Sequence, residues 1–204
     1  MTLEPDLIDR YRRHMNYLRV SITDRCNLRC VYCMPTNRVP KLRHDQVLRY
    51  EEILRIVRVG AELGIRKVRV TGGEPLVRKG VFHFLREVGR VPGVQEVTLT
   101  TNGVLLSESA ERIRAAGIRR INVSLDTLDR RRYHRLTGHD HYESVREGIR
   151  AALAAGLHPV KINVVALRGV NEDELADLAR LSIDTPLHVR FIEYMPLGRR
   201  QVET

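Results

Sequence analysis

The chain has 204 residues, a formal net charge of +10 and 43% hydrophobic residues. This length suits one large domain or two small ones, and the hydrophobic content can fill a core, which excludes global disorder. No apolar run approaches the roughly 18 residues of a membrane span, and the N-terminus lacks the apolar stretch of a signal peptide. Three cysteines without an export signal predict a cytoplasmic protein with no membrane partner.

The positive charge by itself does not predict a nucleic-acid-binding protein. The basic residues are scattered along the chain, and aromatic residues make up only 5% of it. No motif interleaves the two into a platform on which bases could stack. We expect a few of these charges to bind a small polyanionic substrate instead.

Six apolar, β-branched segments alternate with segments of helical spacing, which predicts an α/β fold with a parallel sheet and right-handed crossovers. The expected strands cover residues 17–23, 66–71, 95–101, 119–125, 159–165 and 187–194. The expected helices cover residues 50–64, 79–90, 107–117, 142–156 and 172–182. Gly64, Gly117 and Gly156 stand where helix C-terminal caps belong, and Asn171 with Glu174 forms a potential capping box.

Polar residues alternate with apolar ones in these strands, so each strand has one apolar and one polar side. The polar side includes Arg19, Arg69, Thr100, Ser124 and Lys161. An antiparallel sheet with one solvated face would give the same alternation, but the long helical crossovers argue against it. We therefore expect an open parallel (β/α)6 partial TIM-type barrel, with helices outside and a polar lumen for a large, charged ligand.

All three cysteines fall within eight residues, as Cys26, Cys30 and Cys33 after the first strand. A disulfide framework needs an even number, and a closed tetrahedral zinc site needs four ligands. Three thiolates suit a four-iron cluster that keeps one iron free of protein ligands. Zinc completed by His44 or Asp45 is the alternative, and a redox C-x-x-C motif would not need the third cysteine.

Unusual loops follow most of the other strands. These loops carry TGGEP from Thr71, TNG from Thr101, SLD from Ser124 and EYMP from Glu193. Because ligands collect at the carboxyl ends of parallel strands, we expect these loops to form one site with the cysteine loop.

The motif C-x-x-x-C-x-x-C followed by GGEP resembles the radical S-adenosylmethionine (SAM) superfamily. Within it, the chain is most similar to the GTP 3',8-cyclase family of molybdenum cofactor biosynthesis. The matching text is LRVSITDRCNLRCVYCMP, VRVTGGEPLVRKG, TLTTNG, INVSLDTLD, RLTG, VKINVVALRGVN and RFIEYMPLG. These blocks cover nearly all of residues 17–198 in the family's order.

The resemblance implies a role for individual residues. Cys26, Cys30 and Cys33 would ligate one 4Fe-4S cluster, whose open iron would bind the amino and carboxylate groups of SAM. The positions that match cofactor contacts are Tyr32, Gly73, Ser124 and Met195, and those assigned to GTP are Arg19, Arg69, Thr100 and Lys161. A deoxyadenosyl radical formed from SAM would then take hydrogen from the ribose, whose carbon would join the guanine ring.

The sequence departs from the family after EYMP. The family's second cysteine trio, the ligands of a second cluster, is absent, so we expect residues 1–16 to be an extension and 17–204 a truncated radical SAM barrel. Implied partners are GTP, an electron donor and the next enzyme of molybdopterin synthesis. The last strand would be an edge or a partner-covered surface, such as that of a homodimer. A short radical SAM enzyme with another substrate and a zinc-stabilised nucleic-acid-binding module remain the alternatives.

Three other readings remain open. Lys161 could snorkel at a strand end, and Arg69 could form an internal ion pair with Asp126 or Glu74. His134, His139 and His141 cluster in HRLTGHDH, and we expect a helix end and a loop there rather than a metal site.

Overall fold

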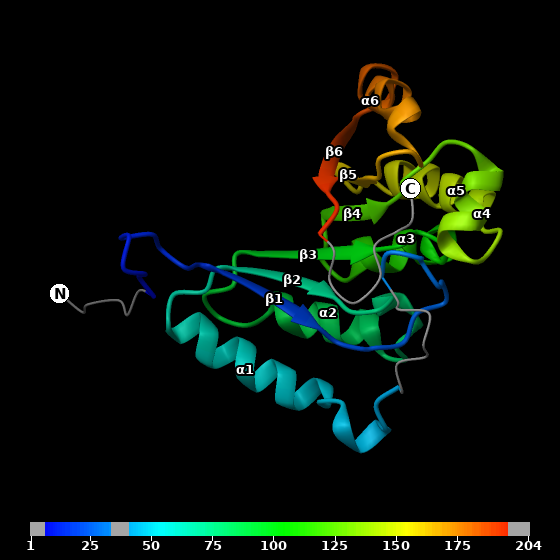
Figure 1. Ribbon diagram of the computed structural model, residues 1–204. Coiled ribbons are helices and arrows are strands. Elements are labelled where there is room, and N and C mark those ends of the chain that lie inside the picture. Colours follow the sequence, from blue (N-terminus) through cyan, green and yellow to red (C-terminus); the bar gives the residue numbers. More distant parts are fainter. Residues whose placement is uncertain (1–6, 34–40, 196–204) are drawn as a thin grey trace.

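The computed structural model describes residues 7–33 and 41–195, and they form one six-stranded parallel sheet whose spatial order follows the chain. The strands are β1 (Tyr17–Ser21), β2 (Lys67–Thr71), β3 (Glu96–Thr101), β4 (Arg120–Ser124), β5 (Val160–Ala166) and β6 (Leu187–Glu193). Strands β1 and β6 are the two ends of this order, so the sheet curves without closing (Figure 1). The expected open (β/α)6 architecture is confirmed.

Six helices connect the strands: α1 (Tyr50–Glu62), α2 (Val81–Gly89), α3 (Leu106–Ala115), α4 (Arg130–Thr137), α5 (Tyr142–Ala154) and α6 (Leu175–Asp184). Short 3-10 turns occur at η1 (His44–Gln46), η2 (Pro75–Val77) and η3 (Glu172–Glu174). In the part of the chain that the structure describes, no helix has the length and hydrophobicity needed to cross a membrane. Gly64, Gly117 and Gly156 have positive φ angles, as expected of residues that end helices.

Helix α4 was not among the helices expected from the sequence, because its segment RRRYHRLT is mostly charged. Both ends of the helix nevertheless carry residues that commonly cap helices. The Asp129 carboxylate accepts a hydrogen bond from the backbone N–H of Arg132 at 2.6 Å, and Gly138 ends the helix with a φ of 72°. Only Tyr133 and Leu136 supply large apolar side chains to its buried face. The expected strands differ from the observed ones by only one or two residues at their ends.

The capping box expected at Asn171 and Glu174 is wrong. The Asn171 side chain is fully buried, accepts from the N–H of Leu167 at 2.7 Å and donates to the carbonyl oxygen of Asp126 at 2.7 Å. The Glu174 carboxylate accepts from the Thr127 hydroxyl at 2.5 Å. Both side chains therefore brace the loops after β4 and β5, because buried backbone groups in these loops need partners more than an exposed helix end does.

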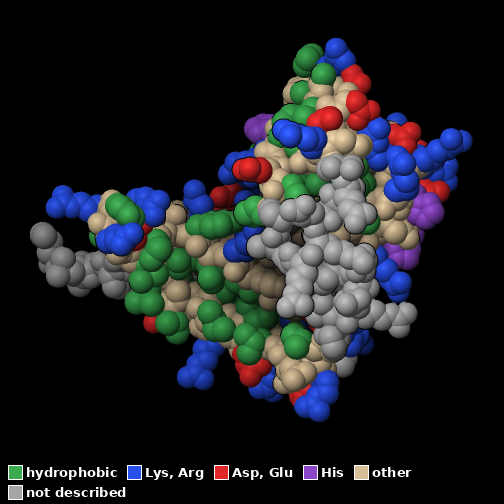
Figure 2. Space-filling model, in the orientation of Figure 1, with side chains coloured by type: hydrophobic (Ala, Val, Ile, Leu, Met, Phe, Trp, Pro, Cys, Tyr) green, Lys and Arg blue, Asp and Glu red, His purple; other side chains and the backbone are tan. Residues whose placement is uncertain are grey.

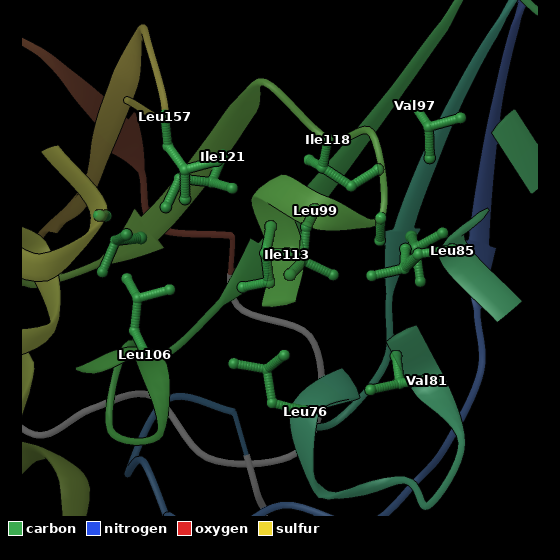
Figure 3. Close-up of a cluster of buried hydrophobic side chains, with 14 of the residues drawn as sticks. Leu76, Val81, Leu85, Val97, Leu99, Leu106, Ile113, Ile118, Ile121 and Leu157 are labelled. Carbon is green, nitrogen blue, oxygen red and sulfur yellow. The ribbon is translucent and has the colours of Figure 1, made fainter. Parts of the chain in front are cut away.

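The core lies between the sheet and the helices on one of its faces. Strand residues such as Leu99 and Ile121 point into it towards side chains of α2 and α3 (Figure 3), and α1 and α5 also contribute to it. Fully buried examples are Val70, Leu99, Ile121, Val123 and Ile162. Burying a side chain of this size contributes about 1.5–3 kcal/mol to the free energy of folding. This apolar face therefore determines which side of every strand the helices cover.

The polar strand residues predicted for the lumen lie on the opposite face, as the alternation predicts. Arg19 pairs in register with Arg69 on the neighbouring strand, and Thr100, Asn122 and Lys161 form one row across β3, β4 and β5. The helices leave this concave face free, so it forms the inner wall of the open barrel.

An open sheet leaves two edge strands, and apolar side chains are exposed at both. On β6, Phe191 is 45% and Ile192 37% exposed. Beside β1, exposed apolar side chains gather over the outer surface of α1 (Figure 2), where Ile56 and Val59 are each 49% exposed. The last described strand is thus an edge, as expected, and its unpaired backbone groups face away from β5.

The packing of α3 against α5 depends on a glycine. A Cβ atom at Gly148 would lie 2.7 Å from the carbonyl oxygen of Gly103 and 2.9 Å from Leu106 Cβ. We expect Gly148→Ala to lower the free energy of unfolding by about 1–3 kcal/mol through overpacking, measured by urea denaturation. In the control Gly89→Ala the nearest atom is 4.0 Å away, so stability should stay equal or rise by up to about 1 kcal/mol. Equal stabilities of the two variants would contradict this account.

Candidate functional site

The loop that carries the cysteines is held on one side by the TGGEP loop after β2. The backbone N–H of Gly73 donates to the Thr23 carbonyl oxygen at 2.6 Å, and that of Glu74 donates to the Arg25 carbonyl oxygen at 2.8 Å. A Cβ atom at Gly73 would lie 2.3 Å from the same Arg25 oxygen, closer than any real contact. The glycine therefore allows the two loops to approach each other, which no other residue would permit.

Helix α4 holds the cysteine loop from the other side. The N–H of Arg29 donates to the carbonyl oxygen of Thr137 at 2.8 Å, and the N–H of Val31 donates to that of Leu136 at 2.9 Å. These two residues flank Cys30, so the end of α4 fixes the backbone on both sides of this cysteine. The unexpected helix is thus part of the site.

The Glu74 side chain joins the TGGEP loop to the end of β3. It is completely buried, and its carboxylate accepts from the Thr101 hydroxyl at 2.9 Å, from Asn102 N–H at 2.6 Å and from Leu76 N–H at 3.0 Å. Burial raises the pKa of Glu74, and these three donors oppose the rise. Glu74 was not predicted as a site residue, although its position within GGEP could have suggested that it joins the loops.

The three cysteines are free thiols, with Cys26 and Cys30 half-buried and Cys33 exposed. Burial, followed by the charges of Asp126 and Cys33, raises the pKa of Cys30 to about 12. Burial and the charge of Cys26 raise the pKa of Cys33. The three thiols are therefore close enough to influence one another, and a cationic centre would be needed to hold them together as thiolates.

Polar groups from other loops also face the cysteine loop. Asn102 donates its amide N–H to the Asn27 side-chain oxygen at 2.7 Å, with Cys26 Sγ 3.7 Å from the same nitrogen. The Tyr32 hydroxyl donates to the buried Asp126 carboxylate, whose other oxygen accepts from Val165 N–H at 2.8 Å. The loops after β3 and β4 therefore meet the cysteine loop, as the sequence predicts, and β5 joins them through Val165, which was not predicted.

A small hollow of about 30 Å³ lies among these groups. Its lining includes three of the predicted site residues, Cys30, Tyr32 and Ser124, together with Asp126 and Tyr133. Gly73 lies at the adjoining loop contact. Met195, two residues beyond β6, is 65% exposed.

A second, cationic cavity of about 240 Å³ occupies the same concave face near the amino ends of the strands. It is lined by two of the predicted substrate residues, Arg69 and Lys161, and by Lys67, Arg120 and Asn122. The two other predicted residues adjoin it: Arg19 pairs with Arg69, and the Thr100 hydroxyl accepts from the Asn122 amide at 3.2 Å.

The charges around Lys161 repel its own. Burial lowers the pKa of Lys161, and the positive charges of Arg190, Arg120 and Arg69 lower it further, with Glu96 acting in the opposite direction. A bound anion would relieve this repulsion. Arg120 and Arg190 were not predicted as site residues, although the alternation of side chains along β4 and β6 places both on the lumen face.

The ion pair suggested for Arg69 is wrong. Its guanidinium donates to the Thr98 hydroxyl at 3.4 Å and lies 5.3 Å from the centre of the Tyr17 ring. Glu74 and Asp126, the acids proposed as partners, are bound to other groups. Arg69 therefore keeps donors available on the lumen face.

The histidine cluster lies where it was expected. His134 is in the last turn of α4, and the rings of His139 and His141 stack in the following loop at 5.8 Å. Within the described ranges, no three His, Cys, Asp or Glu side chains converge on a single metal ion. A 4Fe-4S cube does not require such convergence, because each cysteine binds a different iron. The zinc ligand His44 suggested above has no described side chain.

Comparison with known proteins identifies the family. A model of the radical SAM superfamily matches residues 20–182. The chain belongs to the radical SAM superfamily. Among curated relatives, it is 54% identical over 192 residues to the GTP 3',8-cyclase of Petrotoga mobilis and 55% identical over 190 residues to that of Moorella thermoacetica. These alignments cover 94% and 93% of the chain but only 59% of each relative, so the chain spans about three-fifths of their length.

Solved structures of more distant proteins share the fold. Streptococcus suis SuiB bound to S-adenosylmethionine superimposes with a TM-score of 0.75 at 21% identity, over 89% of this chain and 41% of SuiB. The anSMEcpe enzyme with bound AdoMet gives a TM-score of 0.71 at 20% identity, over 92% and 54%. These likenesses support the partial barrel.

The superfamily implies a 4Fe-4S cluster and SAM, and the residues present fit the cluster. Three free cysteines on one loop provide the thiolates that iron–sulfur clusters use, and the loop contributes no fourth thiol. Backbone and side-chain donors from Leu28 and Asn102 lie within 3.7 Å of Cys26 Sγ. Such donors stabilise thiolates bound to iron.

The buried carboxylate of Glu74 gives a direct test of how the loops are held together. We expect Glu74→Gln to lower the free energy of unfolding by about 1–3 kcal/mol, because its amide would direct N–H groups at neighbours that are themselves donors. The control Glu111→Gln changes an exposed side chain of α3 and should stay within about 0.5 kcal/mol of the wild type. Urea denaturation of the metal-free protein measures both, and an unchanged Glu74→Gln would show that the contacts do not stabilise the fold.

Proposed function

We propose that the chain is the radical SAM core of a GTP 3',8-cyclase, which converts GTP to (8S)-3',8-cyclo-7,8-dihydroguanosine 5'-triphosphate in the first step of molybdenum cofactor biosynthesis. The observation that carries this proposal is the arrangement of the lumen. Thiols lie at the carboxyl end of the strands, and a cluster of positive charges lies towards their amino ends. The two curated relatives, which are 54% and 55% identical to this chain over the aligned residues, bear this name.

At the carboxyl end, Cys26, Cys30 and Cys33 would hold the cluster, which supplies the single electron that cleaves SAM. Of the cofactor positions, Tyr32 and Ser124 line the hollow beside Cys30, and Gly73 exposes backbone in the adjoining loop. Met195 is the fourth proposed contact. The buried pair of Tyr32 and Asp126 would keep this end of the lumen ordered, since both groups satisfy each other's hydrogen bonds.

At the amino end, Arg19, Arg69, Thr100 and Lys161 would bind GTP. Arginine donors can grip phosphate oxygens in pairs, and lysine adds a compact charge. The mutual repulsion around Lys161 means that a triphosphate binds where positive charge is already crowded. The ribose would then lie between the phosphates and SAM, because both ligands share one lumen.

The remaining partners are proposed from the same function. A one-electron donor would reduce the cluster, and the next enzyme of molybdopterin synthesis would take the product. The reaction would take place in the cytoplasm. Residues 17–204 would act as the radical SAM barrel, while residues 1–16 would form an extension.

Iron content and SAM cleavage test the cluster assignment. Anaerobic reconstitution should give about four irons per chain, and the reduced protein should release 5'-deoxyadenosine from SAM but should not cyclise GTP efficiently. Cys30→Ala should lose most of the iron, whereas Asp45→Ala, which removes a ligand of the alternative zinc site, should retain it. Bound zinc would contradict the cluster assignment, whereas about eight irons or rapid cyclisation would contradict only the expectation of inefficient cyclisation.

Nucleotide binding tests the cationic end. Removing one charged hydrogen-bond donor costs about 1.5–3 kcal/mol, so Lys161→Ala should bind GTP roughly 10- to 100-fold more weakly by calorimetry. Its affinity for guanosine should not change, because the lost contact is to phosphate. Lys79→Ala, at an exposed lysine outside the lumen, is the matched control and should bind both ligands normally. Equal losses of affinity for GTP and guanosine would show that Lys161 does not contact the phosphates.

A further inference from the structure

The hydroxyl group of Tyr133 on α4 is buried without a partner. The residue is only 2% exposed, and its oxygen has no hydrogen-bond partner among the described residues. Leaving a buried polar group unsatisfied costs about 1–3 kcal/mol. A hydroxyl placed in this way can donate to an acceptor that comes within reach when the site is loaded.

The position of Tyr133 points to Cys30 as the hydrogen-bond acceptor. Both residues line the same small hollow, whose other walls include Leu28 and Leu136. One turn beyond Tyr133, the carbonyl oxygens of α4 hold the backbone on either side of Cys30. The phenol therefore lies beside this cysteine in the same hollow.

The neighbouring polar groups already have partners. The Thr137 hydroxyl donates to the carbonyl oxygens of Tyr133 and His139, each at 2.8 Å. The Asp126 carboxylate accepts from Tyr32 and from Val165. The Tyr133 hydroxyl has Thr137 nearby but makes no hydrogen bond of acceptable geometry among the described residues.

The aromatic ring itself is held in place. Tyr142 on α5 lies with its ring centre 5.9 Å from that of Tyr133, at an interplanar angle of 57°. This tilted packing is favourable for aromatic pairs. The hydroxyl therefore has little freedom to turn away from the hollow.

We propose that the Tyr133 hydroxyl donates a hydrogen bond to Cys30 Sγ when this cysteine holds iron, and that it thereby raises the reduction potential of the cluster. The inference rests on the cluster assigned in the proposed function. It makes Tyr133 a positioning residue, which acts on the cluster through Cys30.

The direction of the effect follows from electrostatics. Taking up one electron places more negative charge on the cluster and its sulfur ligands, so a hydrogen bond to sulfur is stronger in the reduced state. Stabilising the reduced state raises the potential. The apolar walls of the hollow strengthen the effect, because a hydrogen bond in a low-dielectric site is stronger than one in water.

A redox titration of the reconstituted protein with a one-electron reductant, followed by electron paramagnetic resonance, tests the inference. Tyr133→Phe should shift the equilibrium about three- to tenfold towards the oxidised cluster, and tenfold corresponds to 59 mV for a one-electron couple. Tyr50→Phe is the matched control. Tyr50 also has a buried hydroxyl without a described partner, but its ring stacks on Phe84 and only burial and Arg78 shift its pKa. This control should titrate like the wild type.

A second variant keeps the test decisive if Tyr133→Phe assembles no cluster. Tyr133→3-fluorotyrosine keeps the ring but makes the hydroxyl a stronger donor, so the equilibrium should move the other way, towards the reduced cluster. A general loosening of the site would not raise the potential. Four irons with a potential unchanged in both variants would overturn this inference alone, whereas a wild-type protein without iron would overturn the proposed function.

Discussion

The site depends on the contact between the cysteine loop and the TGGEP loop. At Gly73 the two backbones are so close that a single Cβ atom would lie 2.3 Å from the Arg25 carbonyl oxygen. Two backbone hydrogen bonds join the loops here, and Glu74 extends the connection to β3 through Thr101 and Asn102. A cluster ligated by only three cysteines needs a loop that other elements hold in shape, because three ligands on eight residues constrain little by themselves.

The one-sided sheet explains how a small domain can contain such a polar interior. Helices cover only the apolar face, where Leu99 and Ile121 are fully buried, and the other face keeps its charged and polar residues. In a closed eight-stranded barrel this face would be filled by branched apolar side chains. In the part of the chain that the structure describes, six strands leave the lumen open, with edges at β1 and β6 as the consequence.

The two ends of the lumen have different electrostatic character. The carboxyl end contains buried groups that disfavour charge, since burial raises the pKa of Cys30, Glu74 and Asp126. The amino end crowds positive charges, which lower the pKa of Lys161. A metal cluster with a sulfonium cofactor suits the first environment, and a polyphosphate suits the second. Tyr133 belongs to the first end, where each hydrogen bond to sulfur has a large effect because little water competes.

The sequence alone determined the parallel α/β class, the division of each strand into an apolar and a polar side, and the meeting of the cysteine and TGGEP loops. Periodicity and parallel connections require these features, since successive side chains of a strand alternate and strand ends share one edge. The helix C-terminal caps at Gly64 and similar glycines could also be predicted, because a positive φ strongly favours glycine.

Only the tertiary structure decided the partners of individual polar side chains. Asn171 carries the local signature of a helix cap, yet it braces two loops, because burial makes unpaired backbone groups there more costly. Helix α4 was hidden by its charged sequence and is held in place by the cysteine loop. Arg69 contacts Thr98 and Tyr17 rather than the acids suggested for it, and Tyr133 lies beside Cys30. Such contacts join residues far apart in the chain, so no local pattern can encode them.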